Sequence, residues 1–300
     1  MSAPEHQAFL DPAALNRAEA LGLLARRVVE GYKVGEHRSP LKGFAIEFAQ
    51  HREYALGDDV RHLDWKVLGR SDKLYLKQYE QDTNYVAHLL VDTSGSMAYG
   101  SGAYTKLHYA KLLAATLAHV ILGQRDAVTL GLLGEGPPVL LPRTDTPQRL
   151  PLILDTLARA EAAGTVDLAA QITRLAPAIK RRSIVILIGD FLDGDEALLA
   201  ALPRLRFQNC ETIVFHVLDH AELELPFDDN VRFDGLEGEP SLTTRPADFR
   251  EAYKSEVKAF CDNLRIGCER ADAHYVLADT SQPLAEVLGG YLAFRNRTRT

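Results

Sequence analysis

The chain has 300 residues, a length that corresponds to two domains or to one elaborated α/β domain. Its hydrophobic content of 46% and charged content of 25% are typical of soluble globular proteins, which excludes disorder, collagen and a coiled coil as descriptions of the whole chain. The formal net charge is −7, and residues 1–80 carry 12 basic and 12 acidic side chains, so the excess of acid lies in the remainder. An acidic domain does not attract a phosphate backbone, and we predict no nucleic-acid binding.

Three features of the sequence bear on the cellular compartment of the protein. The three cysteines, Cys210, Cys261 and Cys268, match no CxxC spacing and predict neither a disulfide framework nor a zinc cluster. The first residues, MSAPEHQAFLDP, lack the apolar stretch of a signal peptide. The most apolar helical stretch, residues 112–122, spans only 11 residues and is too short to cross a bilayer. These features predict a cytoplasmic protein without membrane contact.

The first 80 residues differ in character from the rest of the chain. Leu15, Leu21, Leu24 and Val28 recur at helical spacing and predict an amphipathic helix over residues 11–31. Glycines then punctuate short stretches rich in aromatic and charged residues, a pattern typical of small strands and turns. We therefore predict an N-terminal segment over residues 1–80, made of a helix and charged strands and packed on a second domain over residues 81–300.

From residue 85 onward, apolar strands alternate with helices. The predicted strands are residues 85–92, 126–134, 183–190, 212–219 and 274–279. The predicted helices are residues 105–124, 147–162, 167–180, 195–206, 246–265 and 282–294. Continuous apolar strands that alternate with helices indicate an α/β fold, doubly wound around a mostly parallel sheet. Ligands bind such sheets at the carboxyl ends of the strands.

Two of the predicted strands end in aspartate, at Asp92 and Asp190. The sequence after the first strand places a carboxylate and two hydroxyls at Asp92, Ser94 and Ser96, and Gly95 permits the tight turn that brings their oxygens together. An all-oxygen set without His or Cys suits a hard cation, and Mg²⁺ fits best because it needs few protein ligands. The alternative is that Ser94 or Ser96 only caps the following helix.

This Asp-x-Ser-x-Ser sequence resembles the metal-ion-dependent adhesion site of von Willebrand factor type A domains. The resemblance implies a doubly wound, Rossmann-like fold that holds Mg²⁺, or alternatively Mn²⁺ or Ca²⁺, with side chains from three loops. The residues that match the three loops are Asp92, Ser94 and Ser96 in the first, Thr165 in the second and Asp190 in the third. Thr144 and Thr146 are alternatives for the second loop, and Asp193 is an alternative for the third.

Two further stretches of the sequence indicate a particular family among proteins with von Willebrand A-like domains. Residues 35–48, GEHRSPLKGFAIEF, and residues 52–65, REYALGDDVRHLDW, resemble the domain-of-unknown-function family fifty-eight. Members of that family join such a segment to a von Willebrand A-like domain, and many carry N-terminal membrane helices, which the sequence does not predict here. The resemblance implies an adaptor or co-chaperone for a MoxR-type AAA+ ATPase.

The charged stretch around the only tryptophan has two interpretations. Trp and Arg are enriched at binding hot spots, which favours a partner-docking surface. Because the charges are balanced, an internal ion-pair network is the other interpretation, and the one that we favour. The residues concerned are Arg52, Asp58, Asp59, Arg61, Asp64 and Trp65.

The sequence gives little support to an enzyme. Position 94 is Ser, where a haloacid-dehalogenase phosphatase needs a second aspartate, and neither a P-loop nor a GxSxG elbow occurs. We predict a non-catalytic, Mg²⁺-dependent protein-interaction module, in which a partner's carboxylate completes the metal site. The alternatives are a Mg²⁺-dependent hydrolase and a scaffold with a vestigial metal site.

Overall fold

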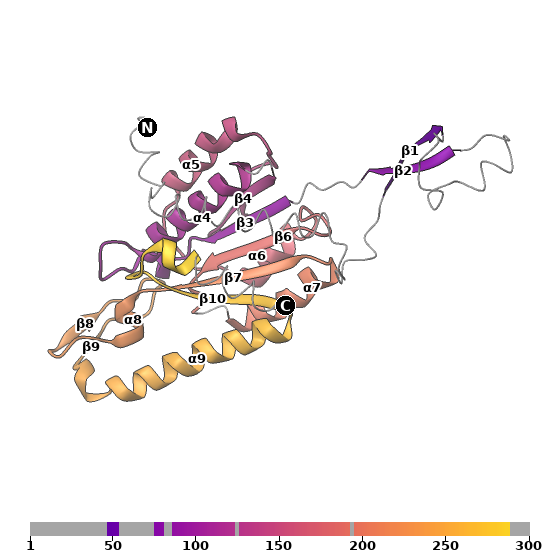
Figure 1. Cartoon of the computed structure of the whole chain (residues 1–300). Coiled ribbons are helices and arrows are strands. Elements are labelled where there is room, and N and C mark those ends of the chain that lie inside the picture. The colour runs from indigo at the N-terminus through magenta and orange to yellow at the C-terminus, as the bar shows by residue number, and fades with distance from the viewer. Residues whose placement is uncertain (1–46, 54–74, 81–85, 124–125, 193–194, 289–300) are drawn as a thin grey trace. The chain divides into compact units, whose positions relative to one another are not determined.

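The computed structural model describes residues 47–53, 75–80, 86–123, 126–192 and 195–288 (Figure 1). The described residues fall into two compact units, one that contains β1 and β2 and one that contains the elements from β3 onward, and each is described by itself. The predicted helix over residues 11–31 lies outside the described residues. The predicted boundary after residue 80 and the packing of the N-terminal segment on the sheet domain stay predictions.

The first unit contains an antiparallel pair of strands, β1 (Glu47–Glu53) and β2 (Tyr75–Glu80). The pairing joins Glu47 to Glu80 and Glu53 to Tyr75, with an irregularity between Phe48 and Gln50. Small strands in this part of the chain were predicted from its composition, and these two confirm that prediction.

The second unit is built on a six-stranded sheet with the order β10-β7-β6-β3-β4-β5. Its strands are β3 (Val86–Asp92), β4 (Ala127–Leu133), β5 (Val139–Leu140), β6 (Ile184–Gly189), β7 (Glu211–Leu218) and β10 (Ala273–Asp279). Only β5 runs antiparallel to its neighbour, which confirms the predicted mostly parallel sheet. The chain runs outward from β3 to β4 and then returns to β6 on the other side of β3. This reversal of strand order places the carboxyl ends of β3 and β6 at a topological switch point, where ligands bind in folds of this class.

Helices connect these strands. They are α4 (Lys106–Gly123), α5 (Leu150–Arg159), α6 (Leu168–Leu175), α7 (Asp195–Phe207), α8 (His220–Glu224) and α9 (Arg250–Arg270), together with the short η2 (Gly95–Ala98), η3 (Pro147–Arg149) and η4 (Pro246–Asp248). Residues 284–288 are also helical. The predicted helices from residue 105 onward are present within the described residues, but α6 ends at Leu175 instead of residue 180, because Pro177 has no backbone N–H with which to continue the helical hydrogen bonds.

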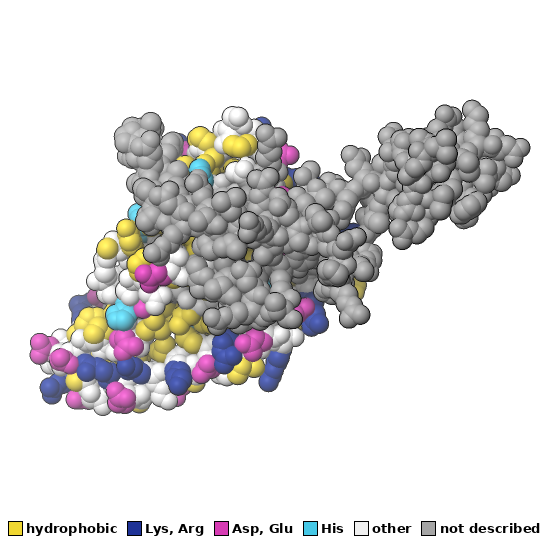
Figure 2. Space-filling view, in the orientation of Figure 1, with side chains coloured by type: hydrophobic (Ala, Val, Ile, Leu, Met, Phe, Trp, Pro, Cys, Tyr) yellow, Lys and Arg dark blue, Asp and Glu magenta, His cyan; other side chains and the backbone are white. Residues whose placement is uncertain are grey.

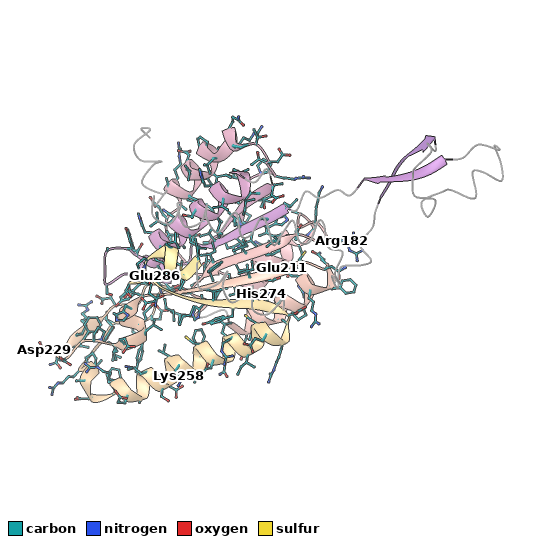
Figure 3. All side chains as sticks on the ribbon, in the orientation of Figure 1. Arg182, Glu211, Asp229, Lys258, His274 and Glu286 are labelled. Carbon is teal, nitrogen blue, oxygen red and sulfur yellow. The ribbon has the colours of Figure 1, made fainter. Side chains whose placement is uncertain are left out.

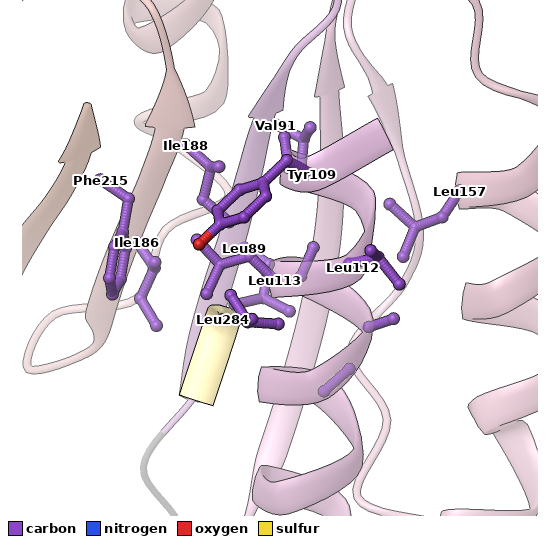
Figure 4. Packing of buried hydrophobic residues seen from close by; sticks show 14 of the residues in the cluster. Leu89, Val91, Tyr109, Leu112, Leu113, Leu157, Ile186, Ile188, Phe215 and Leu284 are labelled. Carbon is purple, nitrogen blue, oxygen red and sulfur yellow. The ribbon is translucent and has the colours of Figure 1, made fainter. Parts of the chain in front are cut away.

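Alternate residues of the central strands face opposite sides of the sheet. Leu89 and Val91 of β3 belong to a buried cluster with α4, α5 and residues 284–288 (Figure 4). Leu90, between them, belongs to a second cluster with α6, α7 and α9. The sheet is therefore covered on both faces, which is why its strands read as continuous apolar runs in the sequence.

A small hairpin, β8 (Val231–Phe233) and β9 (Leu242–Thr244), follows α8 and was not predicted. Its strands are three residues each and none of their residues is buried, so they leave no apolar period in the sequence. Figure 1 shows the hairpin on the side of the sheet where β7 leads into α8.

Charges of both signs mark the outer surface of this unit. In the view of Figure 2, Lys, Arg, Asp and Glu side chains are interspersed along α9. At the opposite end of the strands from α8, His274 of β10 lies 3.9 Å from Glu211 of β7, measured between Nε2 and Oε1 (Figure 3).

Candidate metal centre

The first loop of the candidate centre leaves β3 at Asp92, which is buried. The backbone N–H of Ser94 donates to Asp92 Oδ1 at 2.9 Å, so the loop turns back over its own aspartate. The hydroxyl oxygens of Ser94 and Ser96 lie 3.1 Å apart. The turn requires glycine between them, because a Cβ at Gly95 would lie 2.5 Å from the carbonyl oxygen of Leu236. The three oxygen-bearing side chains predicted from the sequence therefore leave one loop together.

The second loop is joined to the first by backbone hydrogen bonds. Gly95 N–H donates to the carbonyl of Gly164 at 2.7 Å, and Ala163 N–H donates to the carbonyl of Thr93 at 3.1 Å. Gly164 has a φ of +65°, a conformation that favours glycine. Thr165, the predicted ligand of this loop, comes directly after this contact and is solvent-exposed.

The alternative threonines lie elsewhere. Thr144 pairs with Val128 near the amino end of β4. Val128 is in register with Ala87 of β3, five residues before Asp92, so Thr144 lies roughly 16 Å along the strand direction from the first loop. Thr146 follows two residues later and donates to Asp145. Of the three threonines, Thr165 is thus the one whose loop contacts the first loop.

The third loop leaves β6 at Asp190, which is buried. Gly189 precedes it and packs against Asp92, since a Cβ at this position would lie 2.6 Å from the Asp92 Cβ. The ends of the two strands are therefore in direct contact, and the structure brings Asp92 and Asp190 to the same edge of the sheet. The alternative residue Asp193 lies outside the described residues.

A buried lysine, which sequence reasoning missed, reaches the third loop. Lys106 is fully buried at the start of α4, and its Nζ lies 2.7 Å from Asp190 Oδ2 and 2.6 Å from Glu222 Oε1. Burial alone would lower the pKa of Lys106, but the two carboxylates raise it above its ordinary value, so the ammonium stays charged. Glu222 is positioned by a capping box at the start of α8, where it accepts from the Asp219 backbone N–H.

The carboxylates at this edge outnumber the cations. Burial, followed by the charge of Asp190, raises the pKa of Asp92 to about 7, against the lowering effect of the hydrogen bond from Ser94. Glu237, from the β8–β9 hairpin, adds to this repulsion. With Asp190 and Glu222, which pair with Lys106, this edge has four carboxyl groups and one ammonium among the described residues. A divalent cation would offset much of the excess negative charge.

The donor set fits a hard cation. Within the described ranges, no group of three or more His, Cys, Asp and Glu side chains could hold a metal ion, so a site here must draw on hydroxyl oxygens. Asp92, Ser94, Ser96 and Asp190 provide carboxylate and hydroxyl oxygens, which suit Mg²⁺ with several of its waters retained. The residues present therefore match the chemistry that the resemblance implies, and metal binding itself stays a prediction.

The raised pKa of Asp92 makes metal-free stability depend on pH. Its folded pKa of about 7 lies above the ordinary aspartate value of 3.8, so its neutral form favours folding; this contribution is fully present below pH 3.8 and is lost as the pH rises to 7. In EDTA, we expect Asp92→Asn to gain about 2–4 kcal/mol in unfolding free energy relative to wild type between pH 4 and pH 8. Urea unfolding at several pH values measures this. An unchanged difference across that range would contradict it, and Asp145→Asn, in an exposed loop, is the control.

The predicted partner surface cannot be placed. Arg52 belongs to β1, in the unit described separately, and no contact of its side chain is described. Asp58, Asp59, Arg61, Asp64 and Trp65 lie outside the described residues. The docking surface and the internal ion-pair network both stay predictions.

The comparisons with known proteins identify the family. A family model described as "Protein of unknown function DUF58" matches residues 50–260. The chain belongs to this family. Uncharacterized proteins of Mycobacterium tuberculosis and Mycobacterium bovis are each 27% identical to the DUF58 chain over 219 residues, which cover 72% of this chain and 68% of theirs.

Solved structures that are similar to the DUF58 chain have low sequence identity to it. BatB from Bacteroides thetaiotaomicron is 16% identical, with a TM-score of 0.43 over 71% of this chain and 99% of its own. The SpRpn10 VWA domain is 14% identical, with a TM-score of 0.42 over 69% of this chain and 94% of its own. The six-stranded, mostly parallel sheet with a buried cluster on each face confirms the α/β fold that the sequence predicted.

One prediction needs correction. The cytoplasmic location is contradicted, because the similar structures include an "aerotolerance-related membrane protein" from Bacteroides fragilis and an "Uncharacterized Membrane Spanning Protein" from Vibrio fischeri. The prediction rested on the cysteine spacing and on the lack of a signal peptide and of a long apolar stretch, and these patterns do not report where a chain resides. In the part of the chain that the structure describes, no helix has both the length and the apolar character needed to cross a membrane.

Proposed function

We propose that this DUF58 chain is a Mg²⁺-dependent protein-interaction module. One observation carries the proposal: three loops meet at the topological switch point, and they bring hydroxyl and carboxylate oxygens to an edge with excess negative charge. We further propose that the partner is a MoxR-type AAA+ ATPase, for which the chain serves as adaptor or co-chaperone. The family resemblance supports this choice of partner.

In this proposal each loop has a distinct task. Asp92, Ser94 and Ser96 hold the metal directly, and Thr165 and Asp190 contribute directly or through water. Bound Mg²⁺ supplies an electrophilic position that accepts a carboxylate of the partner protein. Lys106 fixes the Asp190 side chain from the buried side by its ion pair. The chain's own groups thus hold and orient, and we propose no catalytic role for them.

Lys106 also favours a second candidate function, a protein scaffold whose metal site is vestigial. Its ammonium already balances the charge of Asp190 at 2.7 Å. In a scaffold of this kind the internal cation replaces the metal, and partner binding is independent of Mg²⁺. The two candidates therefore differ in how binding responds to metal.

The test uses the purified full-length chain and a purified MoxR-type ATPase from the same organism, with affinity measured by biolayer interferometry at constant Mg²⁺. We expect Asp92→Ala to weaken binding by about 100-fold, because the loss removes a charge-assisted contact at the centre of the interface. Asp145→Ala, in an exposed loop, should bind as wild type does. Constant Mg²⁺ avoids the effect of EDTA on the nucleotide of the ATPase. Equal affinity of all three proteins would contradict a metal-centred interface and favour the scaffold.

A further inference from the structure

The tip of the β8–β9 hairpin lies directly on the first loop of the candidate metal centre. The backbone N–H of Ser96 donates to Glu237 Oε1 at 2.9 Å, across 141 positions of the sequence. A Cβ at Gly95 would lie 2.5 Å from the Leu236 carbonyl oxygen and 3.1 Å from Glu237 Cγ. The hairpin tip therefore sits in van der Waals contact with the loop that carries the predicted metal ligands.

The Glu237 carboxylate lies next to a predicted ligand of the metal centre. It accepts from the backbone of Ser96, whose hydroxyl belongs to the predicted ligand set, and its charge acts on Asp92. The turn that presents it is held by Glu239, whose Oε2 accepts the Glu237 backbone N–H at 3.0 Å. An acidic side chain of the protein itself thus stands beside the metal position that the proposed function assigns to a partner.

Contacts from α9 hold the segment that leads into the hairpin, and a cavity lies behind the hairpin. Arg250 of α9 donates to the backbone carbonyls of Leu225 and Phe227, both at 2.9 Å, and forms an ion pair with Asp228. Behind the hairpin lies a cavity of about 520 Å³, between its strands and the side chains of α4, α8 and α9. No residue of β8 or β9 is buried. The tip can therefore leave the first loop without exposing the core of the sheet domain.

We propose that Glu237 is an internal carboxylate ligand of the metal centre, and that a partner binds by replacing it. The inference rests on the proposed function and specifies its regulation. With Glu237 in place, the chain itself fills the ligand position that a partner's carboxylate would take. The hairpin tip then covers the metal centre. A partner's carboxylate must displace the tip, so the observed affinity equals the intrinsic affinity multiplied by the fraction of chains in which the tip is open.

Mn²⁺ and acetate are suitable probes, because Mn²⁺ prefers the same oxygen ligands and reports its own coordination by paramagnetic resonance and water-proton relaxation. We expect Glu237→Gln to weaken Mn²⁺ binding by about 10-fold, since a carboxylate next to the metal is lost while an acceptor for the Ser96 N–H remains. Acetate should displace water from bound Mn²⁺ more readily in this variant than in wild type. Asp234→Asn removes a carboxylate of the same hairpin that pairs with Arg232, and should behave as wild type does.

The possible outcomes separate the two proposals. If Mn²⁺ binds through Asp92 but Glu237→Gln and Asp234→Asn bind Mn²⁺ and acetate alike, the internal ligand is overturned and the metal centre stands. If Mn²⁺ does not bind the wild-type chain, or binds Asp92→Ala equally well, both proposals are overturned. Hydrogen exchange at the Ser96 amide supplies a second readout: acetate should increase it in Mn²⁺-loaded wild type if the tip is displaced, and unchanged exchange together with displaced water would contradict displacement.

Discussion

Asp92→Ala is expected to abolish the rise in melting temperature that we predict Mg²⁺ to give the wild-type chain. A ligand present at 100 times its Kd adds about 2.7 kcal/mol to the unfolding free energy. For a domain of this size, that corresponds to a rise of about 5–10 °C. Asp92 is the buried carboxylate of the first loop and lies against the strand that leads to Asp190, so its loss removes the charge that the metal would balance.

The metal-free melting temperature of the same variant provides a further check. Because Asp92 is repelled by Asp190 in the absence of metal, Asp92→Ala should lose less stability than an ordinary buried truncation. Scanning calorimetry in EDTA and in Mg²⁺ gives both values. Asp145→Ala, in an exposed loop, should keep the full Mg²⁺ response. A Mg²⁺ response of Asp92→Ala equal to that of wild type would rule out this position for the metal.

Lys106→Met is expected to cost about 3–5 kcal/mol of unfolding free energy in EDTA, because it leaves the buried Asp190 and the half-buried Glu222 without their ammonium. The pairs are short, at 2.7 Å to Asp190 and 2.6 Å to Glu222, and the lysine side chain has no exposed surface. Methionine keeps much of the length of the side chain, so most of the loss comes from charge and not from an empty volume. Urea unfolding measures the cost.

Lys106→Met also distinguishes the metal-binding module from the scaffold. If Mg²⁺ binds beside Asp190, it supplies a positive charge there, and the variant should gain more stability from Mg²⁺ than wild type gains. Lys258→Met, on the exposed face of α9 (Figure 3), should change neither the stability nor the response. Lys106→Arg keeps the charge and can be studied if Lys106→Met does not fold. A large cost in EDTA with no extra response to Mg²⁺ would favour the scaffold.

The strongest sequence patterns were those of the central sheet. The strands that end at Asp92 and near Asp190 are buried on both faces, so they appear as unbroken apolar runs. Because parallel strands end at one edge of a sheet, the sequence alone predicts that the two aspartates lie together. The convergence of the Ser94 and Ser96 hydroxyls was also predictable, because both residues belong to the short loop that follows Asp92.

The side chains near the metal centre that the sequence did not predict come from segments distant in sequence and meet only in the tertiary structure. Glu237 meets Ser96 through a hairpin whose three-residue strands have no buried positions and no apolar period. Lys106 left one local signal, since it shares helical spacing with the buried Ala110 and Leu113 and so interrupts an apolar stripe. Glu222 left another, because it stands three residues after Asp219 in a capping box. Neither signal shows that the two side chains meet.

The most direct test of the metal centre is crystallography of the full-length chain with Mn²⁺, using its anomalous scattering to locate the ion. We predict an anomalous peak in contact with oxygens of Asp92, Ser94 and Ser96, at the edge where β3 and β6 end. The peak should disappear in crystals of Asp92→Ala. A fully occupied peak elsewhere, or none at saturating Mn²⁺ with Lys106 still paired to Asp190, would contradict the metal-dependent module.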